Sequence, residues 1–304
     1  MRAVFCCLAV CFALTATGCG RERTVAVPVA PPIVLVDDHG DTVRLPKPAT
    51  RVISLIPSAT ETLIALGAID RIVGRTRYDI DSAVLSKPSV GTGLTPNLET
   101  MVALRPDLVI LWSSDKRGDV QAQLTRAGVR TLAVSLQDTT DAFRALALLG
   151  DAIGERAKAT TLIASLQRTF AATRASVAAE KKPRVFYVVF NNPPMTTGPN
   201  TFIAQILALA GGENIFADSP ANWPTIPMEE LVKRDPDVIV LPVGEMPDSS
   251  VNRLHVMPGW RDLRAVRAGH IVRIDANLAS RPGPNMGRAA VALRDLLHPA
   301  QASK

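Results

Sequence analysis

The feature that most constrains the fold of this chain is an internal repeat, in which the same motifs occur in the same order in both halves. In the first half, Glu99 is followed after five residues by RPDLVIL (105–111). In the second half, Glu229 is followed after five residues by DPDVIVL (235–241). The segments RVISLI and RVFYVVF also correspond, as do TETLIALGAIDRIVG and TFIAQILALAGGENIFA. Because repeated sequence units adopt repeated structures, we expect two similar lobes.

Each half has the pattern of an α/β lobe. Unbroken apolar runs, such as 51–56 and 107–112, alternate with segments of helical spacing. Such alternation is typical of a parallel sheet that is covered on both faces. The first helix is predicted to begin with Ser58 as its N-cap, with Glu61 as the capping-box partner, and to end at Gly67. A small hairpin with the sequence IVLVDDHGDTVRL is expected before these elements.

A proline-free segment separates the two lobes. Residues 139–181 are rich in Ala, Leu, Arg and Lys, and breaks at Gly150 and Gly154 leave a long helix over 155–180. The predicted organisation is a lobe at 33–150, a linking helix at 151–182 and a second lobe at 183–300. Two α/β lobes leave a cleft at the carboxyl ends of their strands, where ligands of such proteins bind.

The N-terminus predicts export and lipid attachment. All four cysteines lie within the first 19 residues, where Arg2 precedes an apolar run and then small residues. This order is typical of a secretory signal peptide, here residues 1–18. Its end, LTATGC, resembles a bacterial lipobox, so we expect cleavage before Cys19 and lipidation of this cysteine. Residues 19–32 then form a tether, and the protein is anchored in the cell envelope on a periplasmic or extracytoplasmic face.

Composition argues against several other functions. The chain has 34 Lys and Arg against 28 Asp and Glu, and its net charge of +6 is spread without a dense basic block. We therefore expect no nucleic-acid partner. Catalytic serine, Walker and dinucleotide motifs are absent from the sequence, and the four histidines are scattered. These observations give no support to an enzyme, a metal site or a resident cofactor.

Aromatic residues outside the apparent core suggest a binding cleft. Tyr78, Trp112, Trp223 and Trp260 lie in predicted loops or just past strand ends. A single loop tryptophan often only covers the edge of a core. Several such residues on opposing lobes instead suit a large, flat, partly apolar ligand.

The repeated glutamates have two interpretations. A glutamate at the start of a short helix interacts favourably with the helix dipole, which explains Glu99 or Glu229 taken alone. Their equivalent positions in both halves favour a second interpretation, in which they dock on a two-fold symmetric partner that carries basic residues.

Four stretches together resemble a known family: RVISLIPSATETLIALG, VGTGLTPNLETMVALRPDLVIL, AGGENIFAD and PGWRDLRAVRAGHIVRIDANLASRPGP. They are similar to the periplasmic-binding proteins of cobalamin, haem and iron-siderophore ABC importers, and most similar to the cobalamin branch. The resemblance covers about residues 50–298. It implies two Rossmann-like lobes joined by a single rigid backbone helix, with little hinge closure.

The resemblance also implies roles for individual residues. Glu99 and Glu229 match the glutamates that meet arginines of the permease dimer. The ligand contacts of the family match Tyr78, Trp112, Trp223 and Arg281.

The family pattern is broken in two places at the rim of the cleft. The family often has an Asp-Tyr-Pro stretch just after the first loop tyrosine, whereas this chain reads RYDIDSAV, and Asn285 follows RPGP where many members have arginine. These differences bear on which ligand binds.

The expected protein is a monomeric, lipid-anchored substrate-binding protein of an ABC importer. It would capture a corrinoid such as cobalamin and deliver it to the permease dimer, whose ATPase subunits supply the energy. A haem or ferric-siderophore carrier is the alternative within the same class. An enzyme or metal-cluster protein with the same two lobes is the alternative from another class.

Overall fold

The computed structural model describes residues 31–113, 119–244 and 254–299. The predicted signal peptide, Cys19 and the tether up to residue 30 lie outside these ranges. Within the described ranges, none of the helices combines the length and apolar character that a membrane span requires.

The predicted hairpin is confirmed. Strands β1 (Ile33–Val36) and β2 (Thr42–Leu45) pair antiparallel. Asp37 holds the turn, because its Oδ1 accepts hydrogen bonds from the backbone N of His39 (3.0 Å) and of Asp41 (2.9 Å).

The first lobe contains a four-stranded parallel sheet in the order β4-β3-β5-β6. Its strands are β3 (Val52–Ser54), β4 (Ile72–Gly74), β5 (Leu108–Trp112) and β6 (Arg130–Val134). Its helices are α1 (Pro57–Ala65), η1 (Ile69–Arg71), α2 (Leu98–Ala103), α3 (Asp119–Arg126) and α4 (Thr139–Ala152).

The second lobe repeats this arrangement with a parallel sheet in the order β10-β7-β11-β12. Its strands are β7 (Arg184–Tyr187), β10 (Glu213–Asn214), β11 (Val238–Val243) and β12 (Ile271–Asp275), with a small pair formed by β8 (Phe190–Asn191) and β9 (Pro194–Met195). Its described helices are α6 (Phe202–Leu209), α7 (Met228–Arg234), η2 (Trp260–Asp262), α9 (Arg264–Arg267), α10 (Ala276–Ser280) and α11 (Met286–Leu297). Each strand therefore occupies the same place in its sheet as its repeat partner, which confirms two similar α/β lobes.

Both sheets are covered on both faces, as the unbroken apolar strands predict. In β5, Leu108 and Ile110 face one hydrophobic cluster, whereas Val109 and Leu111 face another on the opposite side. The first of these clusters also contains Val185 and Val240 of the second lobe, so the two lobes share one core.

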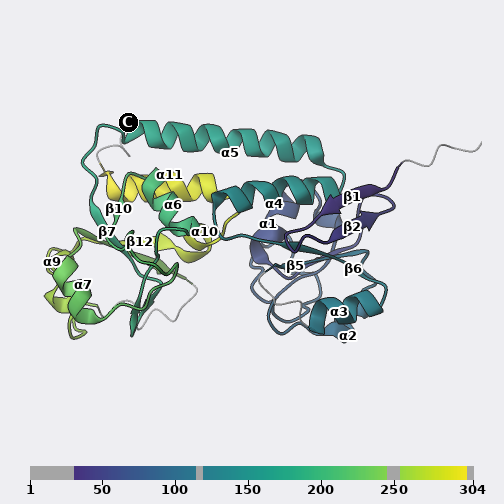
Figure 1. The fold of residues 1–304 in the computed structure, drawn as a ribbon, viewed down its shortest axis with the longest axis horizontal. Coiled ribbons are helices and arrows are strands. Elements are labelled where there is room, and N and C mark those ends of the chain that lie inside the picture. Colours follow the sequence, from purple (N-terminus) through teal and green to yellow (C-terminus); the bar gives the residue numbers. More distant parts are fainter. Residues whose placement is uncertain (1–30, 114–118, 245–253, 300–304) are drawn as a thin grey trace, which may run out of the picture. The chain divides into compact units, whose positions relative to one another are not determined.

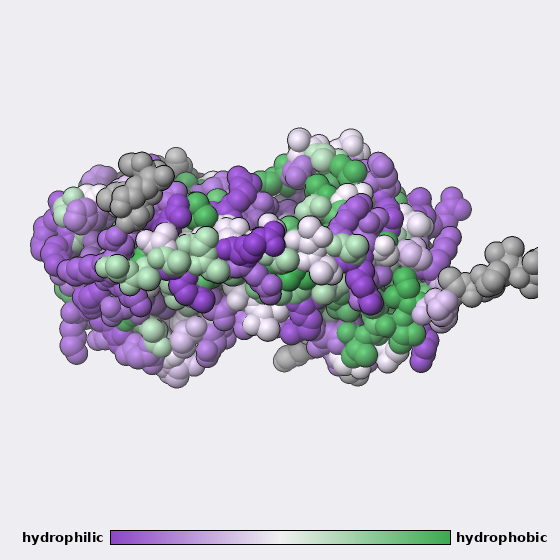
Figure 2. All heavy atoms as spheres, turned by 90° about the horizontal axis from the view of Figure 1, so that it is seen from above, coloured by the Kyte–Doolittle hydropathy of each residue, from purple (hydrophilic) through white to green (hydrophobic). Residues whose placement is uncertain are grey.

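The long helix α5 (Arg156–Ser176) runs above both lobes (Figure 1). Its 21 residues span about 30 Å at 1.5 Å per residue. Leu166 and Phe170 pack into the shared core. The opposite face, seen from above in Figure 2, carries a band of hydrophilic and weakly hydrophobic residues across the molecule. The predicted linking helix is thus present, and one continuous core supports it.

Gly150 does not break the helix as the sequence predicts, because it lies inside α4. A Cβ at this position would come within 2.5 Å of the Cβ of Ala159, so glycine is needed where α4 and α5 pack closely. The break occurs only at Gly154, whose φ of +74° is a left-handed conformation that favours glycine.

The predicted capping box of the first helix is wrong. The N-cap of α1 is Ile56, with Pro57 in the first turn, and Ser58 is buried without capping the helix. Pro57 is favourable there because it lacks an N–H that would need a partner. Glu61 is consequently available for contacts elsewhere. The predicted helix end holds, since Gly67 follows the C-cap residue with φ of +77°.

Trp260 is a core residue, in contrast to its predicted place among the loop aromatics. Its side chain is 1% exposed and packs edge-on against Phe186, with ring centroids 5.7 Å apart. Its indole Nε1 donates a hydrogen bond to the carbonyl O of Asn191 (3.2 Å).

Candidate functional site

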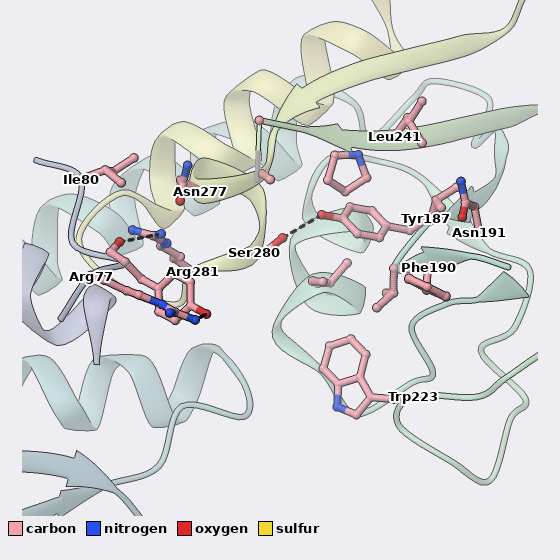
Figure 3. Close-up of a pocket in the computed structure, with 17 residues that line it drawn as sticks. Arg77, Ile80, Tyr187, Phe190, Asn191, Trp223, Leu241, Asn277, Ser280 and Arg281 are labelled. Carbon is pink, nitrogen blue, oxygen red and sulfur yellow. Dashed lines mark hydrogen bonds between the residues drawn. The ribbon is translucent and has the colours of Figure 1, made fainter. Parts of the chain in front are cut away.

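A cavity of about 620 Å³ lies between the two lobes. It is at the carboxyl end of β11, where Leu241 and Pro242 line it, and the loop after β4 supplies the opposite wall. Figure 3 shows Arg77, Ile80 and Arg281 on one side and Tyr187, Phe190 and Trp223 on the other. The predicted interlobe cleft is therefore present.

The first-lobe wall is built on a tight turn after β4. Asp79 Oδ2 accepts hydrogen bonds from the backbone N (2.6 Å) and Oγ1 (2.8 Å) of Thr76. This turn places Tyr78 at the surface of the cavity. The guanidinium of Arg77 lies over the Tyr78 ring, 5.0 Å from its centroid, and Nη2 donates to Tyr78 Oη (2.9 Å).

The second-lobe wall is aromatic. Phe190 and Trp223 are exposed in the cavity, and Tyr187 approaches Ser280, with 3.3 Å between Oη and Oγ. The Trp223 loop packs against Gly198, where a Cβ would come within 2.0 Å of the carbonyl O of Ala221. Glycine at this position therefore allows the close approach that presents Trp223 to the cavity.

Arg281 also lines the cavity, but its guanidinium contacts protein groups. Its Nη1 donates to Glu61 Oε1 (3.0 Å) and its Nη2 donates to the carbonyl O of Tyr78 (3.2 Å). Glu61 and Tyr78 belong to the first lobe, whereas Arg281 follows α10 in the second half. These hydrogen bonds therefore connect the two lobes at the edge of the cavity.

Of the predicted ligand contacts, Tyr78, Trp223 and Arg281 come together around this cavity, and Trp112 does not. Trp112 ends β5 opposite Val134 of β6 and packs, partly buried, against the shared core. Its indole nitrogen lies near Gly93, 3.6 Å from the position a Cβ would take there. The side chain thus packs over the first lobe, although its strand ends at the cleft edge.

Sequence reasoning missed several residues of the site. Arg77 is adjacent to Tyr78, and a cation beside an exposed aromatic ring was a usable signal. Phe190 is the last residue of RVFYVVF, the counterpart of RVISLI, so its place at the carboxyl end of a repeated strand was also a usable signal. Tyr187 and Ser280 carry no local signal, because they are 93 positions apart and only the tertiary fold brings them together.

The two repeated glutamates lie on the same side of the lobes, away from α5. Glu99 is in the first turn of α2 and Glu229 in that of α7, at the lower edge of each lobe in Figure 1. Both are exposed, and neither has an ion-pair partner in the part of the chain that the structure describes.

An exposed valine accompanies each glutamate. Val102 is 41% exposed and Val232 is 39% exposed. Each follows its glutamate by three residues, which places the two side chains on one face of the helix. Both helices are also followed within two residues by a residue with positive φ, Arg105 (46°) in one case and Asp235 (39°) in the other. The repeat therefore reproduces the local surface as well as the fold.

The charges beside Glu229 are paired. Arg234 binds Asp218 (2.6 Å) and Glu230 (2.8 Å), and these hydrogen bonds raise the pKa of its guanidinium. Glu230 is therefore committed to its own helix, which leaves Glu229 as the carboxylate that faces solvent.

Within the described ranges, a group of three potential metal ligands whose atoms lie close together occurs only at the hairpin turn. Side-chain ligand atoms of Asp37, His39 and Asp41 lie within 4.8 Å of one another. The Asp37 carboxylate already accepts three backbone hydrogen bonds, two in its own turn and one from the N of Ala133 (3.1 Å). Its evident role is to attach the hairpin to β6.

The chain is similar to known proteins in sequence and fold. A family model described as periplasmic binding protein matches residues 52–278. The vitamin B12-binding protein of Salmonella paratyphi A is 36% identical over 197 residues, which are 64% of this chain and 72% of that protein. The uncharacterised ABC transporter substrate-binding lipoprotein YvrC of Bacillus subtilis is 28% identical over 275 residues, 88% of this chain and 86% of that protein. The crystal structure of a periplasmic heme-binding protein from Pseudomonas aeruginosa has a TM-score of 0.75 at 26% identity, and covers 83% of this chain and 94% of its own.

Proposed function

The chain belongs to the periplasmic binding protein family that serves ABC importers of vitamin B12, haem and iron-siderophores, and from this premise we propose that it captures a corrinoid such as cobalamin. Proteins of this kind bind small ligands and work with permease and ATPase partners. They are not enzymes, and the cavity needs only to recognise and release its cargo.

The observation that carries the proposal is the pair of aromatic walls. Tyr78 stands on one lobe, and Trp223 and Phe190 stand on the other. Aromatic faces on opposite sides suit a broad, flat ring system, which buries large apolar areas against them. A corrin ring meets this description, and the Salmonella relative is named for vitamin B12.

Haem is the second candidate, because a tyrosine hydroxyl lies in the cavity. Tyr78 Oη accepts a hydrogen bond from Arg77, and a phenol oxygen can bind ferric iron. The similarity to a heme-binding protein supports this alternative.

Titration of the purified protein with cyanocobalamin and with haemin distinguishes the two candidates. Calorimetry and visible absorption measure binding in each titration. Corrinoid binding predicts saturable heat with cyanocobalamin. A shift of the Soret band of haemin when the protein is added, without heat from cyanocobalamin, would assign the protein to haem. If neither ligand binds, both assignments fail.

For delivery, we propose that Glu99 and Glu229 dock on a permease dimer. Each exposed glutamate forms a tip with the valine one turn later, Val102 or Val232. Two equivalent tips suit a two-fold partner that offers, in each subunit, a basic residue beside an apolar one.

For location, we propose that Cys19 carries the lipid and holds a monomer in the cell envelope, on a periplasmic or extracytoplasmic membrane face. The TATGC junction and the lipoprotein name of the Bacillus relative support this proposal. A tether of about a dozen residues would separate the lipid from the hairpin that begins at Ile33.

A further inference from the structure

An ion pair between distant parts of the chain lies beside the cavity, which Arg281 lines. Glu61 is on α1, and Arg281 lies 220 positions later, between α10 and α11. Their side chains are only 17% and 11% exposed, respectively, so the pair is largely shielded from water. A shielded pair with direct hydrogen bonds interacts more strongly than one at an open surface.

The same guanidinium holds the loop of Tyr78. While Nη1 of Arg281 binds Glu61, its Nη2 binds the backbone carbonyl of Tyr78 at 3.2 Å. The planar fork of arginine fixes the directions of both hydrogen bonds. The position of the Tyr78 backbone is therefore coupled to that of Glu61.

A second residue binds the other carboxylate oxygen. Asn285 Nδ2 donates to Glu61 Oε2 at 3.1 Å. Between Arg281 and Asn285, Gly283 passes so close to α1 that a Cβ would lie 3.3 Å from the Cβ of Ser58. Residues 281–285 are thus packed tightly on α1, and Arg281 and Asn285 each bind one carboxylate oxygen of Glu61.

We infer that Glu61 is a positioning residue of the ligand cavity. It anchors Arg281 and, through Arg281, fixes the backbone of Tyr78, so that the Tyr78 ring and the stacked Arg77 face the ligand in one arrangement. Because Glu61 neutralises Arg281, the positive charge offered to a ligand is that of Arg77, which has no ion-pair partner among the described residues. This inference rests on the proposed function, since it assigns Glu61 a part in ligand recognition.

The test is a double-mutant cycle with cyanocobalamin and, separately, haemin as the titrant. Glu61→Gln keeps the size of the side chain but removes its charge. If Glu61 acts through Tyr78, this change weakens binding about tenfold, which corresponds to 1.4 kcal/mol. In a Tyr78→Ala background the same change should alter affinity by less than about twofold, because the positioned group is gone.

A second measurement needs no ligand. Amide hydrogen exchange of residues 77–81 should become faster in the Glu61→Gln protein, because a lost anchor permits local opening. Arg281→Lys should have the same effect, since lysine lacks the planar fork that reaches both partners. The matched control is Glu155→Gln, because Glu155 pairs with Arg71 at 3.2 Å with 22% exposure and lies outside the cavity lining. It should change neither affinity nor exchange at 77–81.

Three results would overturn the inference: wild-type affinity in Glu61→Gln, an equal loss in both backgrounds, or unchanged exchange at 77–81. Tighter haemin binding by Glu61→Gln would also overturn it, because Arg281 would then be a ligand contact that Glu61 restrains. If the wild-type protein binds neither probe, the proposed function fails, whereas the exchange measurement still decides whether Glu61 fixes the Tyr78 loop.

Discussion

Tyr78 and Trp223 line the same cavity from opposite lobes, and they are exposed to nearly the same extent, 49% and 44%. Each side chain is therefore available to cover one face of a ring ligand. We expect Tyr78→Ala and Trp223→Ala each to weaken cyanocobalamin binding by about 1–3 kcal/mol, the usual cost of removing a well-buried aromatic contact. Calorimetric titration of both variants measures this loss.

Trp112→Ala is the control for these variants. Trp112 packs against the shared core and does not line the cavity, so its removal should lower the free energy of unfolding by a few kcal/mol and leave ligand affinity unchanged. A loss of affinity equal to that of Trp223→Ala would contradict this assignment.

Arg77→Gln should reduce binding of an anionic ligand more than that of a neutral one. Arg77 is exposed, and its hydrogen bond to Tyr78 Oη leaves its charge uncompensated in the cavity. We expect the change to cost about 1 kcal/mol for haemin, with its two carboxylates, and less for cyanocobalamin. Titration at low and high salt checks the prediction, since the haemin loss should shrink with salt. Equal losses for both ligands would show that Arg77 acts only by supporting the Tyr78 ring.

Reversal of both docking glutamates, Glu99→Lys with Glu229→Lys, should abolish stimulation of the transporter's ATP hydrolysis while ligand affinity stays nearly unchanged. Each single reversal should be intermediate, because one lobe can still engage. Wild-type docking should weaken with salt, which screens accessible charges over about 10 Å at 0.1 M. Glu213→Lys, an exposed reversal outside α2 and α7, is the charge-matched control for each single reversal.

Substitution of Val102 and Val232 tests whether apolar contacts also contribute to docking. Val102→Asp with Val232→Asp should impair stimulation even at high salt, because a buried apolar contact is not screened. Val36→Asp, at an exposed site on the hairpin, is the matched control. Normal stimulation by the double valine variant would limit the docking surface to the glutamates.

Asp141 should make stability depend on pH. Burial alone would raise its pKa, but hydrogen bonds from the Ser135 hydroxyl and the Gln137 backbone N, together with Arg144, lower the pKa below the usual range. A lowered pKa in the folded state gives stability that is present at neutral pH and is lost as pH falls through the folded value. Asp141→Asn should therefore cost about 1 kcal/mol at pH 7 and much less near pH 3. Urea unfolding at both pH values measures the difference, and an equal cost at both would refute the assignment.

Cys19→Ser should release the protein from the membrane fraction, because the proposed acyl chains supply the attachment. Mass spectrometry of the mature wild-type N-terminus should show lipid on Cys19. Unchanged membrane association of the variant, with no acyl mass on the wild type, would exclude the lipoprotein assignment.

Local patterns in the sequence predicted most of the fold. The spacing of Glu99 and Glu229 before their strands identified the repeat, and the structure shows equivalent strand orders in both sheets. Such predictions succeed because apolar runs and helical spacing report which faces are buried within one element. Local patterns failed at Ser58 and Gly150, where the neighbouring Pro57 and the packing of α5 on α4 outweigh capping and helix propensity.

The sequence by itself thus determined two repeated α/β lobes, the long helix that links them and the equivalent positions of Glu99 and Glu229 in the two lobes. Only the tertiary structure decided which aromatic residues meet. Trp260 joins a core, Trp112 packs over its own lobe, and Trp223 reaches the cavity. The contact of Glu61 with Arg281 likewise spans 220 positions. Contacts of this kind depend on how the two lobes pack beneath α5. The spacing of apolar residues within a single element cannot predict that packing.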